Sequence, residues 1–502
     1  MAAVLFSTCF AQRFHSSCFN GNLIMAEVMN NQRKYNTFRQ TFPEFVYEKY
    51  EYDVQPDGLH IIFCFYANGV GGKNRISFAP SAFIPARPFL NFDQPKPLLD
   101  RLVFNIGMIE LVSYWKAFCP PLVKVECGSL DDNQVAFWKK LYFNGLGEFF
   151  YTNGIQASID EFLDLKPTAV SSKSSIDNSQ SQILNSRFSS LDYLVPIGGG
   201  KDSVVSLELL RSRHTVVPLV MNPRGATIDC CKAAGFSMDE VLVIRRTIAP
   251  TLLDMNAKGA LNGHTPFSAM LAFYSLLAAQ LSAIPNIALS NENSANESTV
   301  VGQNINHQYS KSFEFETDFR DYVAGAIGPQ YNYHSFLRPL CELQIAMLFA
   351  QNETYFDVFK SCNVGSKQDI WCGHCAKCLF AYIILSPFVA PDRLIRIFGK
   401  NMLDDAELKP IFDQLVGMAE TKPFECVGTI AEVRTALSMA SSRWYGSAAE
   451  RPVLLRYWID ELCPTIPGEP LSTVDLATVD CHNHYLSSSD FLALKQCIES
   501  LA

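Results

Sequence analysis

The sequence predicts an α/β protein built on a doubly wound, mostly parallel sheet, with an α+β amino-terminal domain and a helical carboxyl-terminal extension. From residue 193 onward, short apolar runs alternate with helical periodicity, the pattern of parallel strands joined by helical crossovers. The first run ends in three glycines and leads directly into a helix, at the edge where such sheets bind ligands. A length of 502 residues and a hydrophobic content of 48% allow two or three domains.

Composition and charge restrict the function classes. A net charge of −9 argues against a broad basic surface for nucleic acid, so no nucleic-acid partner is expected. No stretch approaches the roughly 18–20 apolar residues of a membrane helix, so no membrane partner is expected either. Sixteen cysteines in so long a chain do not form a disulfide scaffold, and a reducing, cytoplasmic location follows. The oligomeric state cannot be read from the sequence.

The amino-terminal part divides into three expected regions. Residues 1–40 lack the basic start of a signal peptide and are expected to be poorly ordered. Residues 41–168 form the α+β domain, with strands at 45–52, 60–66 and 123–127 and helices at 98–117 and after Asp131 or Asp132. This domain shows no catalytic constellation, which favours a role in gripping substrate or forming an interface. Residues 169–190 are rich in serine and are predicted to be a linker.

The second domain is predicted at 191–385 and the helical extension at 386–502. The domain alternates four strands with three helices, the strands at 193–197, 216–221, 240–245 and 286–290 and the helices at 203–212, 226–234 and 267–282. Helices at 403–418 and 429–444 are expected in the extension. The cluster Asp480-Cys481-His482-Asn483-His484 contains a chelating His-x-His spacing, but a surface turn is the favoured interpretation.

The glycine stretch is predicted to bind phosphate. Glycines let the backbone approach an anion, and the N–H groups at the start of the following helix face it. A Walker A loop needs Lys followed directly by Ser or Thr, and here Asp202 stands between them. Lys201 would offset phosphate charge and Asp202 would hold magnesium. An ordinary strand–helix turn is the alternative. The expected nucleotide-binding residues are Gly198, Gly199, Gly200, Lys201, Asp202 and Ser203.

Three later blocks carry polar side chains that could serve chemistry. Asn262-Gly263-His264-Thr265-Pro266-Phe267 precedes a buried helix, and Ser290–Asn296 follows a buried strand, where an α/β sheet places ligand groups. Glu292 is the expected second catalytic carboxylate, although polar turns also arise merely to end strands. The third block is Asn306–Glu316, in which His307 is a candidate proton carrier near neutral pH, with a structural role as the alternative.

A cysteine cluster gives the clearest metal signal. Cys362, Cys372, Cys375 and Cys378 are spaced so that four thiolates can converge on one ion. Four protein ligands leave no open position, so the expected ion is a structural zinc. Buried free thiols are the alternative.

Together, these blocks resemble a known superfamily. The glycine loop is similar to the pyrophosphatase loop (S-G-G-x-D-S), with Gly198 where that superfamily usually has Ser. The Asn-Gly-His-Thr-Pro block, the Ser-Asn-Glu block and the cysteines resemble the 7-cyano-7-deazaguanine synthase branch. Residues 306–309 and 423–429 bring the resemblance closest to the MurL-type, ATP-dependent epimerases of UDP-N-acetylmuramoyl-L-alanyl-L-glutamate. It covers roughly residues 40 to 495 and implies an adenine nucleotide alpha-hydrolase-like fold.

The resemblance implies a reaction and its cofactors. Such epimerases invert the terminal L-Glu of the muramoyl dipeptide through an acyl-adenylate, converting ATP to AMP and pyrophosphate, with Mg²⁺ as cofactor. Lys201, Asp202, Glu292 and His307, selected above from their residue types and positions, are the expected catalytic residues. Two alternatives stay open: an amide- or nitrile-forming synthetase that consumes ammonia, and a nucleotide sensor without turnover. The acid/base pair at the glutamyl α-carbon and the uridine and muramoyl contacts cannot be assigned from the sequence.

Overall fold

The computed structural model describes residues 21–168, 192–297, 306–466 and 475–501. They form two compact units, each discontinuous in sequence. Unit 1 contains the described residues up to 168 together with 242–286 and 314–332, and unit 2 contains 192–241, 287–313 and the residues from 333 onward. The predicted serine-rich linker at 169–190 and the first 20 residues of the predicted poorly ordered start lie outside the described residues. The rest of that start, residues 21–40, lies in helix α2 (Gly21–Thr41).

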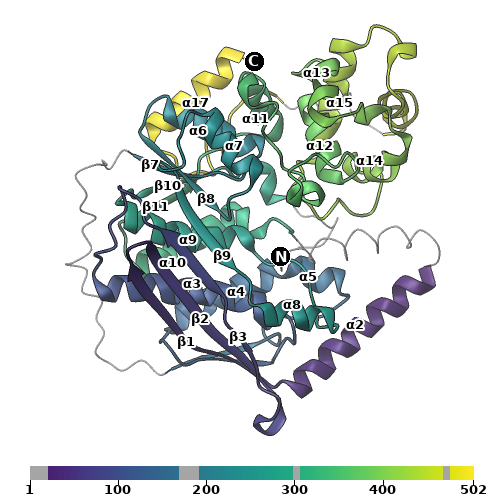
Figure 1. Ribbon diagram of the computed structural model, residues 1–502. Helices are drawn as coiled ribbons and strands as arrows, with labels where there is room; N and C mark the ends of the chain where they lie inside the picture. The colour runs from purple at the N-terminus through teal and green to yellow at the C-terminus, as the bar shows by residue number, and fades with distance from the viewer. Residues whose placement is uncertain (1–20, 169–191, 298–305, 467–474, 502) are drawn as a thin grey trace. The chain divides into compact units, whose positions relative to one another are not determined.

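Unit 1 contains a mixed sheet in which strands follow the order β9-β4-β2-β1-β5-β6, with β3 also paired to β2. β1 pairs antiparallel with β2, its neighbour in Figure 1. β1 also pairs parallel with β5, and β5 pairs parallel with β6. The strands are β1 (Glu44–Gln55), β2 (Gly58–Asn68), β3 (Ile76–Phe78), β4 (Ser81–Pro85), β5 (Leu122–Val125), β6 (Asp164–Pro167) and β9 (Leu242–Thr247). β9, predicted as a strand at 240–245, is a strand, and in unit 1 it pairs antiparallel with β4.

The helices of unit 1 are fixed by apolar burial and local caps. α3 is buried along most of its length and packs against α9. Asp131 caps α4, where its side chain accepts a hydrogen bond from the Gln134 N–H. Arg39 of α2 donates to the carbonyls of Cys119 and Phe162, at 2.9 and 2.6 Å. The helices are α3 (Lys96–Trp115), α4 (Asp132–Gly145), α5 (Gly147–Thr152), α8 (Pro250–Ala257), α9 (Phe267–Ser282) and α10 (Phe313–Ala326).

Unit 2 has the strand order β11-β10-β7-β8, with β7 and β8 parallel. α6 and α11 pack together, and α12 packs against α13, α14 and α15 (Figure 1). The strands are β7 (Tyr193–Pro196), β8 (Val216–Met221), β10 (Asn286–Leu289) and β11 (Asn332–Ser335). The helices are α6 (Lys201–Arg211), α7 (Gly225–Ala233), α11 (Glu342–Phe349), α12 (Ala376–Leu385), α13 (Pro391–Phe398), α14 (Lys409–Leu415), α15 (Ile430–Trp444), α16 (Val453–Arg456) and α17 (Ser488–Leu501).

The predicted mixed α/β class is confirmed, while the adenine nucleotide alpha-hydrolase-like arrangement stays a prediction. One predicted helix is wrong. Residues 403–418 do not form a single helix, because two 3₁₀ turns, Met402–Asp404 and Ala406–Leu408, precede the short α14. Asp405 caps the second turn. Pro410 occupies the first turn of α14, where proline is tolerated, whereas proline farther inside a helix is not.

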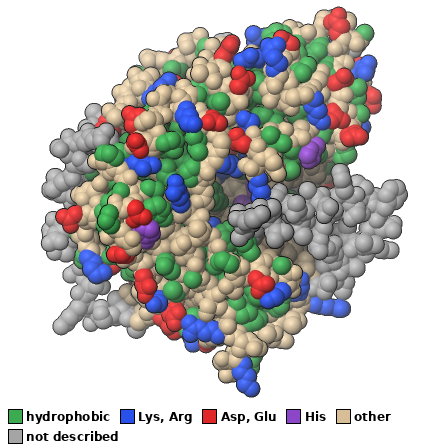
Figure 2. Space-filling model, in the orientation of Figure 1, with side chains coloured by type: hydrophobic (Ala, Val, Ile, Leu, Met, Phe, Trp, Pro, Cys, Tyr) green, Lys and Arg blue, Asp and Glu red, His purple; other side chains and the backbone are tan. Residues whose placement is uncertain are grey.

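The described surface and helices are consistent with the charge and the hydropathy of the sequence. On the face that Figure 2 shows, acidic and basic side chains are interspersed rather than gathered by sign. Within the described ranges, no helix has both the length and the hydropathy that a membrane crossing requires. The cytoplasmic location and the lack of a nucleic-acid partner stay predictions.

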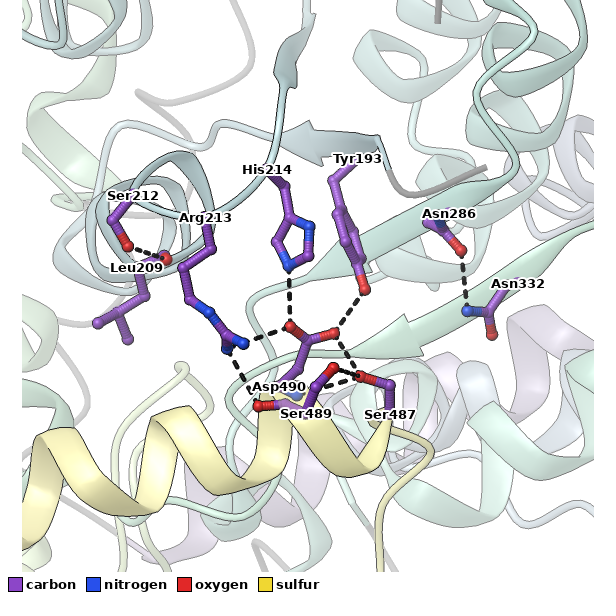
Figure 3. Close-up of polar contacts among 10 residues, drawn as sticks. All are labelled: Tyr193, Leu209, Ser212, Arg213, His214, Asn286, Asn332, Ser487, Ser489 and Asp490. Atoms are coloured by element: carbon purple, nitrogen blue, oxygen red, sulfur yellow. Dashed lines mark hydrogen bonds and ion pairs between the residues drawn. The ribbon is translucent and has the colours of Figure 1, made fainter. Parts of the chain in front are cut away.

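A buried carboxylate ties α17 to the start of the unit 2 sheet (Figure 3). Asp490, only 3% exposed, accepts hydrogen bonds from the Tyr193 hydroxyl and the Ser487 hydroxyl, both at 2.7 Å. His214 Nε2 lies 2.9 Å from the same carboxylate, and Arg213 adds a longer contact of 3.5 Å. The side chain therefore joins α17, β7 and the segment after α6.

We expect Asp490→Asn to lower the free energy of unfolding at neutral pH by about 1.5–3 kcal/mol, the usual contribution of hydrogen bonds to a charged group. Burial alone would raise the pKa of Asp490, but the bonds from Ser487, His214 and Tyr193 lower it below its usual value. A carboxyl with a lowered folded-state pKa stabilises the fold above its unfolded pKa of about 3.9 and loses that contribution as the pH falls through the folded value. The difference between wild type and variant should therefore shrink in acid.

Urea denaturation at pH 7 and at successively lower pH values measures this difference. Gln496→Ala, an exposed position on the same helix, is the matched control and should leave stability within about 0.5 kcal/mol of wild type. Equal stability of Asp490→Asn and wild type at pH 7 would contradict the assigned role of this carboxylate.

Candidate active site

The glycine loop of unit 2 joins the buried strand β7 to α6. Gly199 has a φ of +83°, and a Cβ there would lie 2.9 Å from the Cβ of Ala226 and 3.0 Å from the Thr227 nitrogen. Only glycine fits that position. Gly198 is exposed and a Cβ there would meet no atom within 4 Å. Gly200 is the N-cap of α6, so the first N–H groups of that helix have no side-chain cap and can receive an anion.

Three carboxylates converge beside this loop. Asp202 lies in the first turn of α6, Glu292 follows β10, and Glu342 begins α11. One oxygen from each lies within 4.8 Å of the others. Glu292 and Glu342 are each 3% exposed, whereas the Asp202 side chain is 34% exposed and can reach a ligand. Oxygen ligands in such a group suit a hard divalent cation such as Mg²⁺, so these residues fit the expected cofactor.

Lys201 is enclosed by two of these carboxylates. Its ammonium group donates to Asp202 and to Glu342. Burial alone would lower the pKa of Lys201, but the charges of the two carboxylates outweigh burial and raise the pKa above its usual value. Burial alone would raise the pKa of Asp202, but the charge of Lys201 outweighs burial and lowers it. Lys201 and Asp202 therefore remain charged at neutral pH.

Glu342 is a member of the site that sequence reasoning missed. Burial raises its pKa, and the nearby charges of Asp202 and Glu292 add to that effect against the opposing charge of Lys201. A divalent cation would relieve this crowding of negative charge. The available signal was a glutamate at the start of an otherwise almost wholly apolar helix, where a carboxylate is costly to bury.

A second polar group in unit 2 contains Lys311, His307 and Cys426. Lys311 Nζ lies 3.2 Å from Cys426 Sγ, and His307 also hydrogen-bonds to this sulfur. Arg338, which is fully buried, donates to the Glu292 carbonyl at 2.7 Å and to the Lys311 carbonyl. It therefore fastens the segment carrying Lys311 to the segment carrying Glu292. The structure thus brings predicted His307 together with Lys311 and Cys426, to which the sequence assigned no role.

The four predicted zinc ligands lie together. Cys375 Sγ is 3.5 Å from Cys378 Sγ and 3.8 Å from Cys362 Sγ, and Cys372 Sγ is 3.7 Å from Cys378 Sγ. Zn–S bonds of about 2.3 Å in a tetrahedron give sulfur separations of about 3.8 Å, whereas a disulfide needs about 2.05 Å. His374 is exposed and its Nδ1 contacts the Cys372 carbonyl at 2.8 Å. The donor set therefore fits a structural zinc held by thiolates alone.

The Asn262–Phe267 block belongs to unit 1, where buried polar groups hold it. Lys116 donates to the Gly263 carbonyl, and Asn153 donates to the Asn262 carbonyl at 3.1 Å. His264 Nδ1 lies 3.3 Å from a Glu148 oxygen. Burial, helped by the charge of Arg246, lowers the pKa of Lys116 to about 8. This block is therefore an ordered polar element of unit 1.

The His-x-His cluster near residue 482 lies on the surface, where Cys481, His482 and Asn483 are exposed. This placement agrees with the predicted surface turn. We assign this cluster no role in catalysis or metal binding.

Comparison with known proteins identifies the family. The MurL N-terminal domain matches residues 36–336, and the MurL C-terminal domain matches residues 358–461. Three relatives are each named UDP-N-acetyl-alpha-D-muramoyl-L-alanyl-L-glutamate epimerase. The protein from Xanthomonas oryzae pv. oryzae is 34% identical over 79% of this chain and 86% of its own length. Those from Micromonospora sp. and Salinispora tropica are 34% and 33% identical, over 76% and 79% of this chain and 83% and 84% of their own. The chain belongs to the MurL family.

Proposed function

We propose that this protein is an epimerase that inverts the terminal L-Glu of UDP-N-acetylmuramoyl-L-Ala-L-Glu to D-Glu through an acyl-adenylate, with ATP giving AMP and pyrophosphate. The observation that carries the proposal is the glycine loop followed by Lys201 and a cluster of three carboxylates, in a chain of the MurL family. The names of the relatives support the choice of substrate and of reaction. This role places the chain in the synthesis of peptidoglycan precursors.

Activation of the glutamyl carboxylate explains why a nucleotide is needed. Removing the α-proton next to a free carboxylate would build a second negative charge on an anionic group. When a carboxylate oxygen attacks the α-phosphate of ATP, an O–P bond forms and the bond to pyrophosphate breaks. The resulting acyl-adenylate has lost the carboxylate charge, so the acyl oxygen can carry the charge of an enolate.

Several residues of unit 2 have separate roles in that first step. The N–H groups of residues 198–203 bind phosphate oxygens at the start of α6, and Lys201 offsets charge on the departing pyrophosphate. Asp202, Glu292 and Glu342 would hold the magnesium ion. The chemistry that a magnesium ion would supply there is neutralisation of the charge that develops on the leaving group. The four cysteines would hold a zinc ion that shapes the fold and takes no part in the reaction.

Turnover in deuterium oxide tests the proposal. With ATP, magnesium and the muramoyl dipeptide, the product should be D-glutamyl and should carry deuterium at the α-carbon. Each inversion should release one AMP and one pyrophosphate, without ADP. Omitting ATP should stop exchange, because a side-chain base does not deprotonate next to a free carboxylate at a useful rate. Chiral analysis of glutamate, mass spectrometry and nucleotide chromatography supply the measurements.

Three results would contradict the proposal. Exchange without ATP would remove the acyl-adenylate from the mechanism. AMP release that requires ammonia and leaves the glutamate in its L form would favour the synthetase alternative. Nucleotide binding without any turnover would favour the sensor.

A further inference from the structure

Cys426 lies outside the zinc cluster, and the elements of the carboxylate site hold it in position. It is carried by the segment that leads into α15, whose N-cap Thr429 forms a capping box with Glu432. The second oxygen of that Glu432 carboxylate accepts a hydrogen bond of 2.5 Å from the Glu342 N–H. The segment that carries Cys426 is thereby attached to the helix that begins with Glu342.

The partners of the sulfur are attached to the same site. Lys311, 3.2 Å from Cys426 Sγ, belongs to the segment that Arg338 fastens to Glu292. Lys377 lies in α12, where its N–H donates to the Glu425 carboxylate at 3.0 Å. Lys311 and Lys377 act electrostatically on both Asp202 and Cys426. The pKa values of the Cys426 thiol and of the Asp202 carboxyl are therefore lowered by the same two positive charges.

The surroundings of Cys426 favour the thiolate. Burial alone would raise the pKa of the thiol, but the charges of Lys311 and Lys377 and the hydrogen bond with His307 lower it well below its usual value. Cys426 as a whole residue is half-buried. A thiolate beside a lysine and a histidine in such a residue is typical of a reactive cysteine rather than of an inert core cysteine.

We propose that Cys426 is the catalytic base that removes the α-proton of the activated glutamyl group, with His307 passing that proton to solvent. This inference rests on the proposed function. The C–H bond breaks, the proton moves to Sγ, and the electron pair stays on the α-carbon and spreads onto the acyl oxygen as an enolate. Water supplies the proton that returns on the opposite face, and a second water hydrolyses the acyl-adenylate to D-Glu and AMP. Lys311 is a positioning residue that holds the thiolate.

The test separates adenylation from proton transfer in the complete protein. With wild type, Cys426→Ala and Cys426→Ser, AMP and pyrophosphate release and deuterium incorporation at the α-carbon are measured in parallel on UDP-N-acetylmuramoyl-L-Ala-L-Glu. The base role predicts that both variants still release AMP and pyrophosphate within about tenfold of wild type. Deuterium incorporation and inversion should fall by about 10²–10⁴-fold, the usual contribution of a general base. Cys497→Ser, a half-buried cysteine of α17, is the control and should retain both activities.

The outcomes distinguish this inference from the proposed function. If the wild-type protein shows no ATP-dependent exchange, both the proposed function and the base role are overturned. Wild-type exchange that persists in Cys426→Ala would overturn the base role alone, as would equal loss of AMP release and exchange. A thioester to Cys426 trapped by acid quench in wild type would make the cysteine a nucleophile and also overturn the base role. Should the variants fail to fold, alkylation of wild type by iodoacetamide at pH 6.5 serves instead. Modification mapped to Cys426 should then remove exchange and spare AMP release, and loss of both would reject the inference.

Discussion

Asp202→Asn should lower pyrophosphate release by at least about 100-fold while the protein remains folded. The substitution keeps the shape of the side chain and removes the negative charge that faces both Lys201 and the expected magnesium ion. Loss of one group that stabilises developing charge in a phosphate site commonly costs a factor of about 10²–10³. Because the side chain is 34% exposed, the fold depends on it less than on the buried Glu292 and Glu342. Pyrophosphate release with ATP and the muramoyl dipeptide is the measurement.

Asp229→Asn is the matched control, since it removes the same charge from an exposed position on α7. Circular dichroism and urea denaturation confirm that each variant is folded. Normal turnover by folded Asp202→Asn would remove this residue from the mechanism and, with it, the assignment of the loop.

Cys375→Ser should abolish zinc binding and destabilise unit 2 by several kcal/mol. Cys375 is the N-cap of α12, and its sulfur lies 3.5 Å from that of Cys378 in the first turn. A structural zinc site couples the free energy of metal binding to folding, so losing one ligand weakens both. Elemental analysis of purified wild type should give close to one zinc per chain, and the variant should give almost none. Thermal and urea denaturation measure the change in stability.

Cys481→Ser, at an exposed cysteine, should keep both the metal content and the stability of wild type. A wild-type protein that contains no metal and keeps its full stability after treatment with a chelator would reject the zinc site.

The features that the sequence could predict are those encoded by neighbouring residues. The glycine loop is a strand, a turn and a helix start within about ten residues, and the cysteine cluster follows from spacing between 362 and 378. Glu292 was identifiable because a polar run follows a buried strand. Helix 403–418 was predicted wrongly because its hydrophobic pattern is helical. The pattern does not register that Asp405 caps a 3₁₀ turn or that Pro410 fits only in the first turn of a helix.

The features that it could not predict depend on contacts between distant residues. Glu342 meets Lys201 across 141 positions, and Cys426 meets Lys311 across 115. No local spacing links these residues, and tertiary packing alone decides which of the many glutamates and cysteines arrive at the site. For the same reason β9 was identifiable as a strand, while its antiparallel pairing with β4 was not.

The contact of Asp490 with Tyr193 and His214 can form during synthesis only after residue 490 has been added to the chain. These partners lie 297 and 276 positions earlier, so both have left the ribosome long before the carboxylate that they bind. The strand that leads into the glycine loop therefore lacks its final polar partner while the 297 positions up to Asp490 are translated. A nascent chain arrested after residue 342 and before residue 490 contains the whole loop and all three carboxylates yet lacks this interaction. Such a chain is a natural substrate for chaperones and proteases that act on incomplete folds.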